Sequence, residues 1–119
     1  MDEHREVTVT PDRYLTYRYA GASGDFNPIH LDDEFARSVG LPGRILHGLW
    51  TMAQVARVHG EAAGDPLALK SLSVQFRGMG VPEKEITITS KPRGDGEFDT
   101  EAVQDGNKLV RRGRAVLKL

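Results

Sequence analysis

Residues 47–63 predict one long helix whose apolar side chains cover most of its circumference. The helix starts near His47-Gly48, and Gly64-Asp65-Pro66 ends it, because glycine and proline interrupt helical structure. Its apolar residues are Leu49, Trp50, Met52, Ala53, Val55, Ala56 and Val58. A helix that is apolar nearly all round is typically a buried helix. The rest of the chain must therefore supply a surface that encloses it.

The segments that follow this helix predict such a surface, because apolar and polar residues alternate in them. Alternation with a period of two is typical of a strand with one buried face. The predicted strands are 71–77, 86–89, 97–104 and 108–119, with turns at Gly94-Asp95-Gly96 and Asp105-Gly106. Packing the sheet around the helix buries the apolar faces of both. We therefore expect an α+β fold, with an antiparallel sheet wrapped around one long central helix.

The N-terminal third predicts a short strand followed by two helices. The strand covers residues 5–10, and Thr10-Pro11 then supplies an N-cap and a first-turn proline for a helix that ends near Ala22. Residues 23–31 form a loop. Asp32 or Asp33 caps the second, short helix, which ends at Gly40.

Length and charge restrict the chain to a small globular class. Its 119 residues are enough for one domain and too few for two independent cores, so we expect a single domain over residues 1–119. Sixteen Lys and Arg residues against 17 Asp and Glu leave a formal charge of -1. Nucleic-acid binding draws on basic residues that neutralise phosphates. We therefore expect no nucleic-acid partner.

Cysteine is absent from the sequence, and so is any long apolar run. Without cysteine there is no disulfide, no Cys-ligated zinc or iron–sulfur site, and no thiol nucleophile. The most apolar stretch, residues 45–56, is interrupted by polar residues and is shorter than the roughly 18 apolar residues of a membrane span. The N-terminus shows no signal peptide. These features predict a soluble, cytoplasmic protein with no membrane partner.

The segment Asp25-Phe26-Asn27-Pro28-Ile29-His30 places a carboxylate and an imidazole on one loop. Pro28 has a fixed φ and biases Asn27 to extended geometry, so the loop is stiff. A stiff loop can direct both side chains at one point. An Asp/His pair that shares a water is a general acid–base device, which typically contributes about 10²–10⁴ in rate.

Gly48 begins the long predicted helix, directly after His47. The N–H groups in the first turn of a helix lack partners within the helix and lie at the positive end of its dipole. In a dry cleft they can hold a developing oxyanion, and glycine allows close approach. A thioester carbonyl that becomes enolate-like on attack at its β-carbon is one such oxyanion.

The residues YAGASGDFNPIHLD at 19–32, followed by GRILHGL at 43–49, resemble the hydratase-2 signature of the MaoC-like family. That family includes (R)-specific enoyl-CoA hydratases and (R)-3-hydroxyacyl thioester dehydratases. The resemblance covers about residues 7–119, nearly the whole chain. It implies a hot-dog fold, in which the sheet wraps the long helix, and a dimer whose two sheets join.

Matched position by position, the resemblance implies that Asp25 and His30 are the catalytic pair, that Asn27 orders the loop, and that the Gly48 amide is the oxyanion donor. The implied reaction is the reversible hydration of a trans-2-enoyl thioester to the (R)-3-hydroxyacyl thioester, with no cofactor. The acyl group is carried on coenzyme A or on acyl carrier protein. The implied assembly is a homodimer, or a heterodimer with a second hot-dog subunit.

Two other functions stay open at this point. A hot-dog acyl-thioesterase would share the fold, but it would not need the Asp25–His30 loop together with a glycine at the helix start. An acyl-binding subunit of a heteromeric dehydratase would keep the fold without turnover. Activity of the purified chain separates the enzymes from the silent binder.

Other candidate residues have a structural interpretation beside the functional one. His47 either lines the cleft or is a buried histidine that shapes the loop. Trp50 either packs in the core or narrows the acyl tunnel. Asp25, His30 and His47 would hold a metal only as a preformed ligand cluster; nothing else in the sequence supports one, so we expect no metal.

Arginines are the candidates for contact with a pantetheine or nucleotide phosphate. They are Arg44, Arg77, and residues Arg111, Arg112 and Arg114 near the C-terminus. A solvated strand edge is the simpler interpretation of the last three. His4 and His59 are expected to be structural or solvated.

Overall fold

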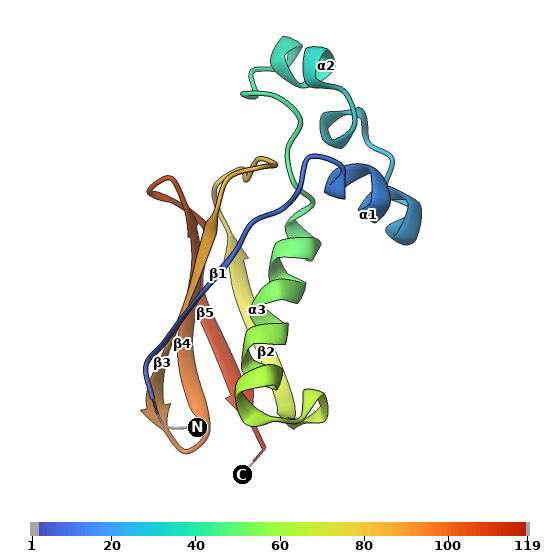
Figure 1. The fold of residues 1–119 in the computed structure, drawn as a ribbon. Coiled ribbons are helices and arrows are strands. Elements are labelled where there is room, and N and C mark those ends of the chain that lie inside the picture. The colour runs from blue at the N-terminus through green and yellow to red at the C-terminus, as the bar shows by residue number, and fades with distance from the viewer. Residues whose placement is uncertain (1–2, 119) are drawn as a thin grey trace.

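The computed structural model describes residues 3–118 (Figure 1). Within this range the strands form one antiparallel sheet with the order β1-β3-β4-β5-β2. They are β1 (Arg5–Val9), β2 (Leu69–Phe76), β3 (Ile86–Gly94), β4 (Glu97–Gln104) and β5 (Asn107–Leu117). The two predicted turns join β3 to β4 and β4 to β5, and their glycines have positive φ. The strands β1 and β2 lie at the two edges of the sheet.

The long helix α3 (Gly48–Ala63) lies along one face of this sheet, as Figure 1 shows. Its residues Val55 and Val58 pack against apolar side chains of β3, β4 and β5, which are Ile86, Ile88, Ala102, Leu109 and Val110. Burial of these side chains is the main favourable term that holds helix and sheet together. The expected α+β fold with a central helix is thereby confirmed.

The face of α3 that points away from the sheet is exposed in this chain. Leu49 is 64% exposed, and Ala53 is also exposed, whereas Thr51, Val55 and Val58 are buried. The expectation that the helix is enclosed all round is therefore wrong for a single chain. One curved sheet contacts one side of a helix, so a second surface is needed to cover the other side.

The helices α1 (Leu15–Ser23) and α2 (Asp33–Ser38) lie beyond the end of the sheet at which α3 begins (Figure 1). The predicted end of α1 is confirmed, since Gly24 caps it in the left-handed conformation. Asp32 caps α2 by accepting a hydrogen bond from the Phe35 amide. The predicted loop between them contains a short 3₁₀ helix, η1 (Pro28–His30), and a second one, η2 (Pro66–Ala68), follows α3.

The predicted start of the first helix is wrong. Thr10-Pro11 does not cap it, and α1 begins only at Leu15. The Pro11 carbonyl accepts a hydrogen bond of 2.7 Å from the Glu83 amide, which holds this stretch against the segment before β3. The Asp12 carbonyl then accepts from the Leu15 amide at 3.2 Å, and the helix starts there. A contact between distant segments therefore overrides the local capping signal.

His59 is a fully buried polar residue on the sheet-facing side of α3. Its Nδ1–H donates to the Val55 carbonyl at 2.8 Å, and its Nε2 accepts from the Ser90 hydroxyl of β3 at 2.8 Å. Burial lowers the pKa of His59 below its ordinary value of 6.5. The folded protein therefore holds His59 in the neutral form, with both ring nitrogens hydrogen-bonded.

We expect the free energy of unfolding to fall as the pH drops below about 6.5. The pKa of His59 is lowered in the folded state, so below the unfolded value of 6.5 the unfolded chain binds more protons. The loss continues until the pH reaches the lowered folded pKa. Denaturant titrations at a series of pH values measure it, and a His59→Gln variant, which cannot titrate there, should show a smaller drop. If the free energy of unfolding depended on pH identically in both proteins, His59 would not be the source of the drop.

Candidate active site

The loop that carries Asp25 is ordered by hydrogen bonds to its own neighbours. The Asp25 amide donates to the Ser23 hydroxyl at 3.2 Å, and Asp25 Oδ1 accepts from the Asn27 amide at 3.2 Å. Asn27 Oδ1 in turn accepts from the Ile29 amide at 3.1 Å and caps η1, where Pro28 is the first residue. Asn27 thus lies where a loop-ordering residue is needed, and the second carboxylate oxygen of Asp25 is left for other contacts.

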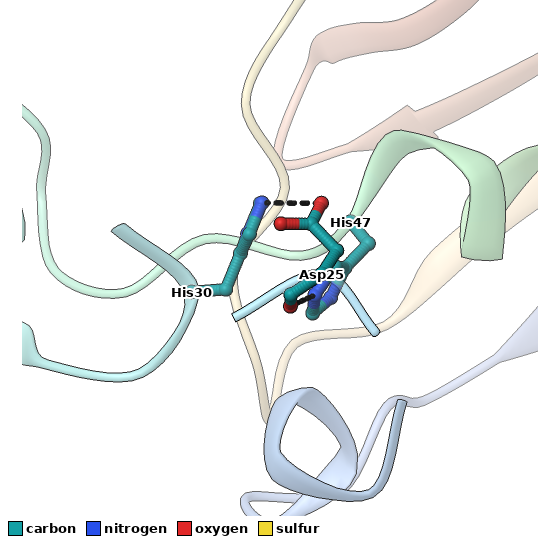
Figure 2. A group of neighbouring side chains, drawn as sticks. All are labelled: Asp25, His30 and His47. Atoms are coloured by element: carbon teal, nitrogen blue, oxygen red, sulfur yellow. Dashed lines mark hydrogen bonds and ion pairs between the residues drawn. The ribbon is translucent and has the colours of Figure 1, made fainter. Parts of the chain in front are cut away.

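His30 closes η1 and is buried. Its Nδ1 lies 2.8 Å from the Ile45 carbonyl oxygen. A carbonyl can only accept, so Nδ1 carries the proton and Nε2 presents a lone pair. Figure 2 shows this Nε2 facing the Asp25 carboxylate, with a distance of 3.7 Å to Oδ2.

That distance is too long for a direct hydrogen bond. It is short enough for one water or hydroxyl oxygen to contact both groups. The side chain of Asp25 is 53% exposed and that of His30 only 9%, so the pair joins an accessible carboxylate to a sheltered imidazole. This arrangement can hold a water and move its proton, which is general acid–base chemistry.

His47 lies beneath this pair, as Figure 2 shows, and is 4% exposed. Its Nε2–H donates to the main-chain carbonyl of Asp25 at 3.1 Å. Its ring stacks on the His30 ring with centroids 3.8 Å apart and planes at 20°. Burial lowers the pKa of His47, and the nearby His30 acts in the same direction. His47 is therefore neutral at physiological pH.

The three side chains Asp25, His30 and His47 each offer a ligand atom, and these atoms lie within 4.8 Å of one another. A metal needs imidazole lone pairs that converge on it in the planes of the rings. The rings of His30 and His47 are stacked and nearly parallel, and Nε2 of His47 donates to a carbonyl. The cluster therefore fits an acid–base pair that is supported by His47, and it does not fit a metal centre.

Gly48 begins α3, so its first-turn amides lack partners within the helix. A Cβ atom at this position would lie 3.2 Å from the Phe76 ring, so the ring lies close against Gly48, which is itself exposed in this chain. Gly48, His30, Thr51 and Phe76 line one cavity of about 300 Å³. The helix start and the imidazole therefore share a mostly apolar pocket, which is where an amide can stabilise an oxyanion.

Trp50 packs against the hydrophobic core with Val7 and Val9 of β1. Its proposed role at an acyl tunnel stays a prediction. The Arg44 guanidinium is bound inside the chain, to the Asp33 carboxylate at 2.8 Å and to the Arg13 carbonyl. The Arg44 guanidinium is therefore already engaged and is not free for the phosphate contact considered above.

Two contributors to the site have no clear signal in the sequence. The Ile45 carbonyl sets the tautomer of His30, and a main-chain acceptor has no residue signature. Phe76 reads as one more apolar residue of an alternating strand, although its ring lies over Gly48. Arg77, which the sequence did suggest as a contact residue, lines the same cavity.

The chain is similar in sequence to a known family of proteins. The family model described as MaoC like domain matches residues 1–112. The peroxisomal enoyl-CoA hydratase 2 of Arabidopsis thaliana is 36% identical over 110 residues, which is 91% of this chain and 35% of that protein. The chain therefore spans about a third of the length of this curated relative.

Solved structures share the fold. A MaoC-like dehydratase from Phytophthora capsici has a TM-score of 0.89 and 30% identity, over 96% of this chain and 40% of that one. The (R)-hydratase of A. caviae has a TM-score of 0.84 and 21% identity, over 99% of this chain and 95% of that one. This last likeness concerns the fold alone.

The hydrogen bonds of the site predict opposite tautomers for the two stacked histidines. His30 should carry its proton on Nδ1, because Ile45 supplies an acceptor there, and His47 on Nε2, because the Asp25 carbonyl accepts from it. Long-range ¹H–¹⁵N NMR spectra above pH 7 distinguish the two forms. The Asp25→Asn variant should leave the His47 tautomer unchanged, since the acceptor is the main chain. The same tautomer in both rings would contradict this geometry.

Proposed function

This chain belongs to the family of MaoC-like domains, and from that premise we propose that it catalyses the reversible hydration of trans-2-enoyl thioesters to (R)-3-hydroxyacyl thioesters. The observation that carries the proposal is the pair of Asp25 and His30, with Oδ2 and Nε2 3.7 Å apart. Next to it, His30 and the start of α3 line one apolar cavity. The relative from Arabidopsis thaliana is named an enoyl-CoA hydratase 2, which agrees with this activity.

In the proposed mechanism, Asp25 and His30 hold a water between them. The pair removes one proton as the water oxygen forms a bond to C3 of the enoyl group. The electron pair of the C2–C3 double bond moves toward the thioester carbonyl, whose oxygen accepts a hydrogen bond from the Gly48 amide. The pair then delivers a proton to C2 on the same face, so one water is added in total. We assign the roles of base and acid to the pair and not to either group alone.

The size of each contribution follows from its chemistry. General acid–base groups typically supply about 10²–10⁴ in rate, and one oxyanion donor supplies about 10²–10³. The walls of the cavity are mostly apolar, and an apolar environment strengthens electrostatic stabilisation of the transition state. The substrate is an acyl thioester of coenzyme A or of acyl carrier protein. A hot-dog thioesterase is the alternative, and it would release a free thiol from the same substrates.

The first test is the loss of enoyl-thioester absorbance with crotonyl-CoA. We expect hydration by the wild type, a fall of roughly 10² or more in Asp25→Asn and in His30→Ala, and the (R) alcohol on chiral analysis. Asp95→Asn, in the exposed turn between β3 and β4, is the matched control and should be fully active.

Two outcomes would contradict this mechanism. Full activity in both variants would show that the pair does not carry the reaction. Release of free coenzyme A thiol in place of hydration would favour the thioesterase.

The proposed assembly is a pair of hot-dog folds, either two copies of this chain or this chain with a different subunit. Two surfaces support it. The strand β2 is an edge strand, whose outer hydrogen-bonding groups are a template for another strand. Beside it, a hollow of about 660 Å³ is lined by Ala53, Ala56, Gly60 and Leu69, and it contains none of the catalytic candidates. A second fold on this side would cover the exposed face of α3.

Sedimentation analysis tests the homodimer. We expect the wild type to show twice the chain mass of 13.1 kDa. Ala56→Glu should shift it to the mass of one chain, because burying an unpaired charge at an interface is costly. Val39→Glu, which changes an exposed residue after α2, is the control and should stay dimeric. A wild type of single-chain mass would contradict the homodimer.

Other expectations from the sequence stay predictions. They are a single domain over residues 1–119, a reaction without a cofactor, and a cytoplasmic location. In residues 3–118, no helix has the length and apolar character needed to cross a bilayer. The relative from Arabidopsis thaliana is named as peroxisomal.

A further inference from the structure

We propose that His47 is a positioning residue for the Asp25–His30 pair, and that it acts through two separable contacts, a hydrogen bond to Asp25 and a ring stack on His30. The inference rests on the proposed hydration activity. It concerns a residue that the mechanism above does not use. With 4% exposure and its Nε2–H engaged by a carbonyl, His47 is not placed to touch substrate.

The first contact fixes the main chain of Asp25. The hydrogen bonds that Asp25 makes to Ser23 and Asn27 are local, within two residues, and they move with the loop. The bond from His47 Nε2–H spans 22 residues and ties the Asp25 carbonyl to the segment before α3. An exposed carboxylate on a loop would otherwise sample many positions. With the carbonyl tied and Oδ1 held by the Asn27 amide, Oδ2 is left directed at His30.

The second contact fixes the plane of the His30 ring. The Ile45 carbonyl holds Nδ1 of His30, but a ring held at one atom can still tilt. The stacked ring of His47, 3.8 Å away at 20°, removes that freedom on one face. Tyr19 of α1 lies against the His47 ring, with centroids 4.8 Å apart. His47 is thus held between α1 and the ring that it supports.

The charge state of His47 agrees with this role. The groups that face it are Asp25, His30 and Tyr19. The Asp25–His30 pair gains a proton during acid–base catalysis, and a positive ring stacked on His30 would oppose that step. Burial keeps His47 neutral by lowering its pKa. A neutral support can hold the pair without opposing its protonation.

The position of His47 in the chain links it covalently to other parts of the site. It is the N-cap residue of α3, directly before Gly48. The segment 45–48 therefore supplies the acceptor for His30, the donor for Asp25 and the proposed oxyanion amide. These three parts are covalently linked, so their spacing is set by one short piece of backbone. A small misplacement destroys this preorganisation, and a shift of about 1 Å can lower the rate by about 10²-fold.

Two substitutions separate the contacts. His47→Gln keeps an N–H donor near the position of Nε2 and removes the ring, while His47→Phe keeps a ring for stacking and removes the donor. We expect kcat for crotonyl-CoA hydration to fall by roughly 10–100-fold in His47→Phe, with KM within about threefold of wild type because the cavity walls are unchanged. His47→Gln should recover at least part of that loss. The same changes at the exposed His4 should leave kinetics unchanged.

A readout independent of activity accompanies the kinetics. In His47→Phe, the backbone NMR signals of residues 25–30 should shift or broaden, and in His47→Gln they should stay near the wild-type positions. His30 should keep its Nδ1–H tautomer in both variants, because Ile45 still accepts from it. Wild-type kcat and undisturbed loop signals in both variants would overturn the proposal. Equal changes of kcat, KM and melting temperature in the two variants would also overturn the proposal, because a general packing role predicts that result.

The two proposals fail in different ways. If the wild type does not hydrate crotonyl-CoA, the proposed function fails on that substrate, whereas the NMR comparison of the Phe and Gln variants still decides whether His47 holds the Asp25 loop. If the wild type is active and Asp25→Asn is not, but His47→Phe matches the wild type, the function stands and the positioning role is wrong.

Discussion

The packing of α3 against the sheet is the contact on which the rest of the molecule depends. Val55, Val58 and their partners on β3, β4 and β5 hold the helix at one place along the sheet. The start of α3 is thereby fixed in space, and with it the segment 45–48. Since that segment supplies the Ile45 carbonyl, His47 and Gly48, the hydrophobic core positions these three parts of the site.

The site joins two segments of different character. The 25–30 loop is stiff because of its own turns, and it presents Asp25 to solvent. In the 45–48 segment, residues 45–47 are buried and Gly48 is exposed. Three hydrogen bonds join them, from the Ile45 amide to the Ile29 carbonyl, from His30 to the Ile45 carbonyl, and from His47 to the Asp25 carbonyl. The carboxylate can stay accessible to substrate because the main chain and the imidazoles behind it are sheltered.

The same arrangement leaves surfaces uncovered. Because one sheet covers one side of α3, the other side and the edge of β2 remain exposed. Leu49 directly follows Gly48 in the chain, and the Phe76 ring lies against Gly48; both are exposed apolar residues. The open surfaces thus lie next to the proposed reaction centre, which links the proposed pairing of two hot-dog folds to the shape of the substrate site.

The sequence by itself determined the features that local chemistry controls. Gly48 and Gly64 mark the ends of α3, the glycine turns mark the hairpins, and the Asp25–His30 loop was recognisable from its residues. Only the tertiary structure decided where α1 starts, which side of α3 stays open, and that His47 stacks on His30. Propensity and alternation act between neighbours in the chain, whereas these outcomes depend on contacts between segments that are distant in sequence and meet only when the helix packs on the sheet.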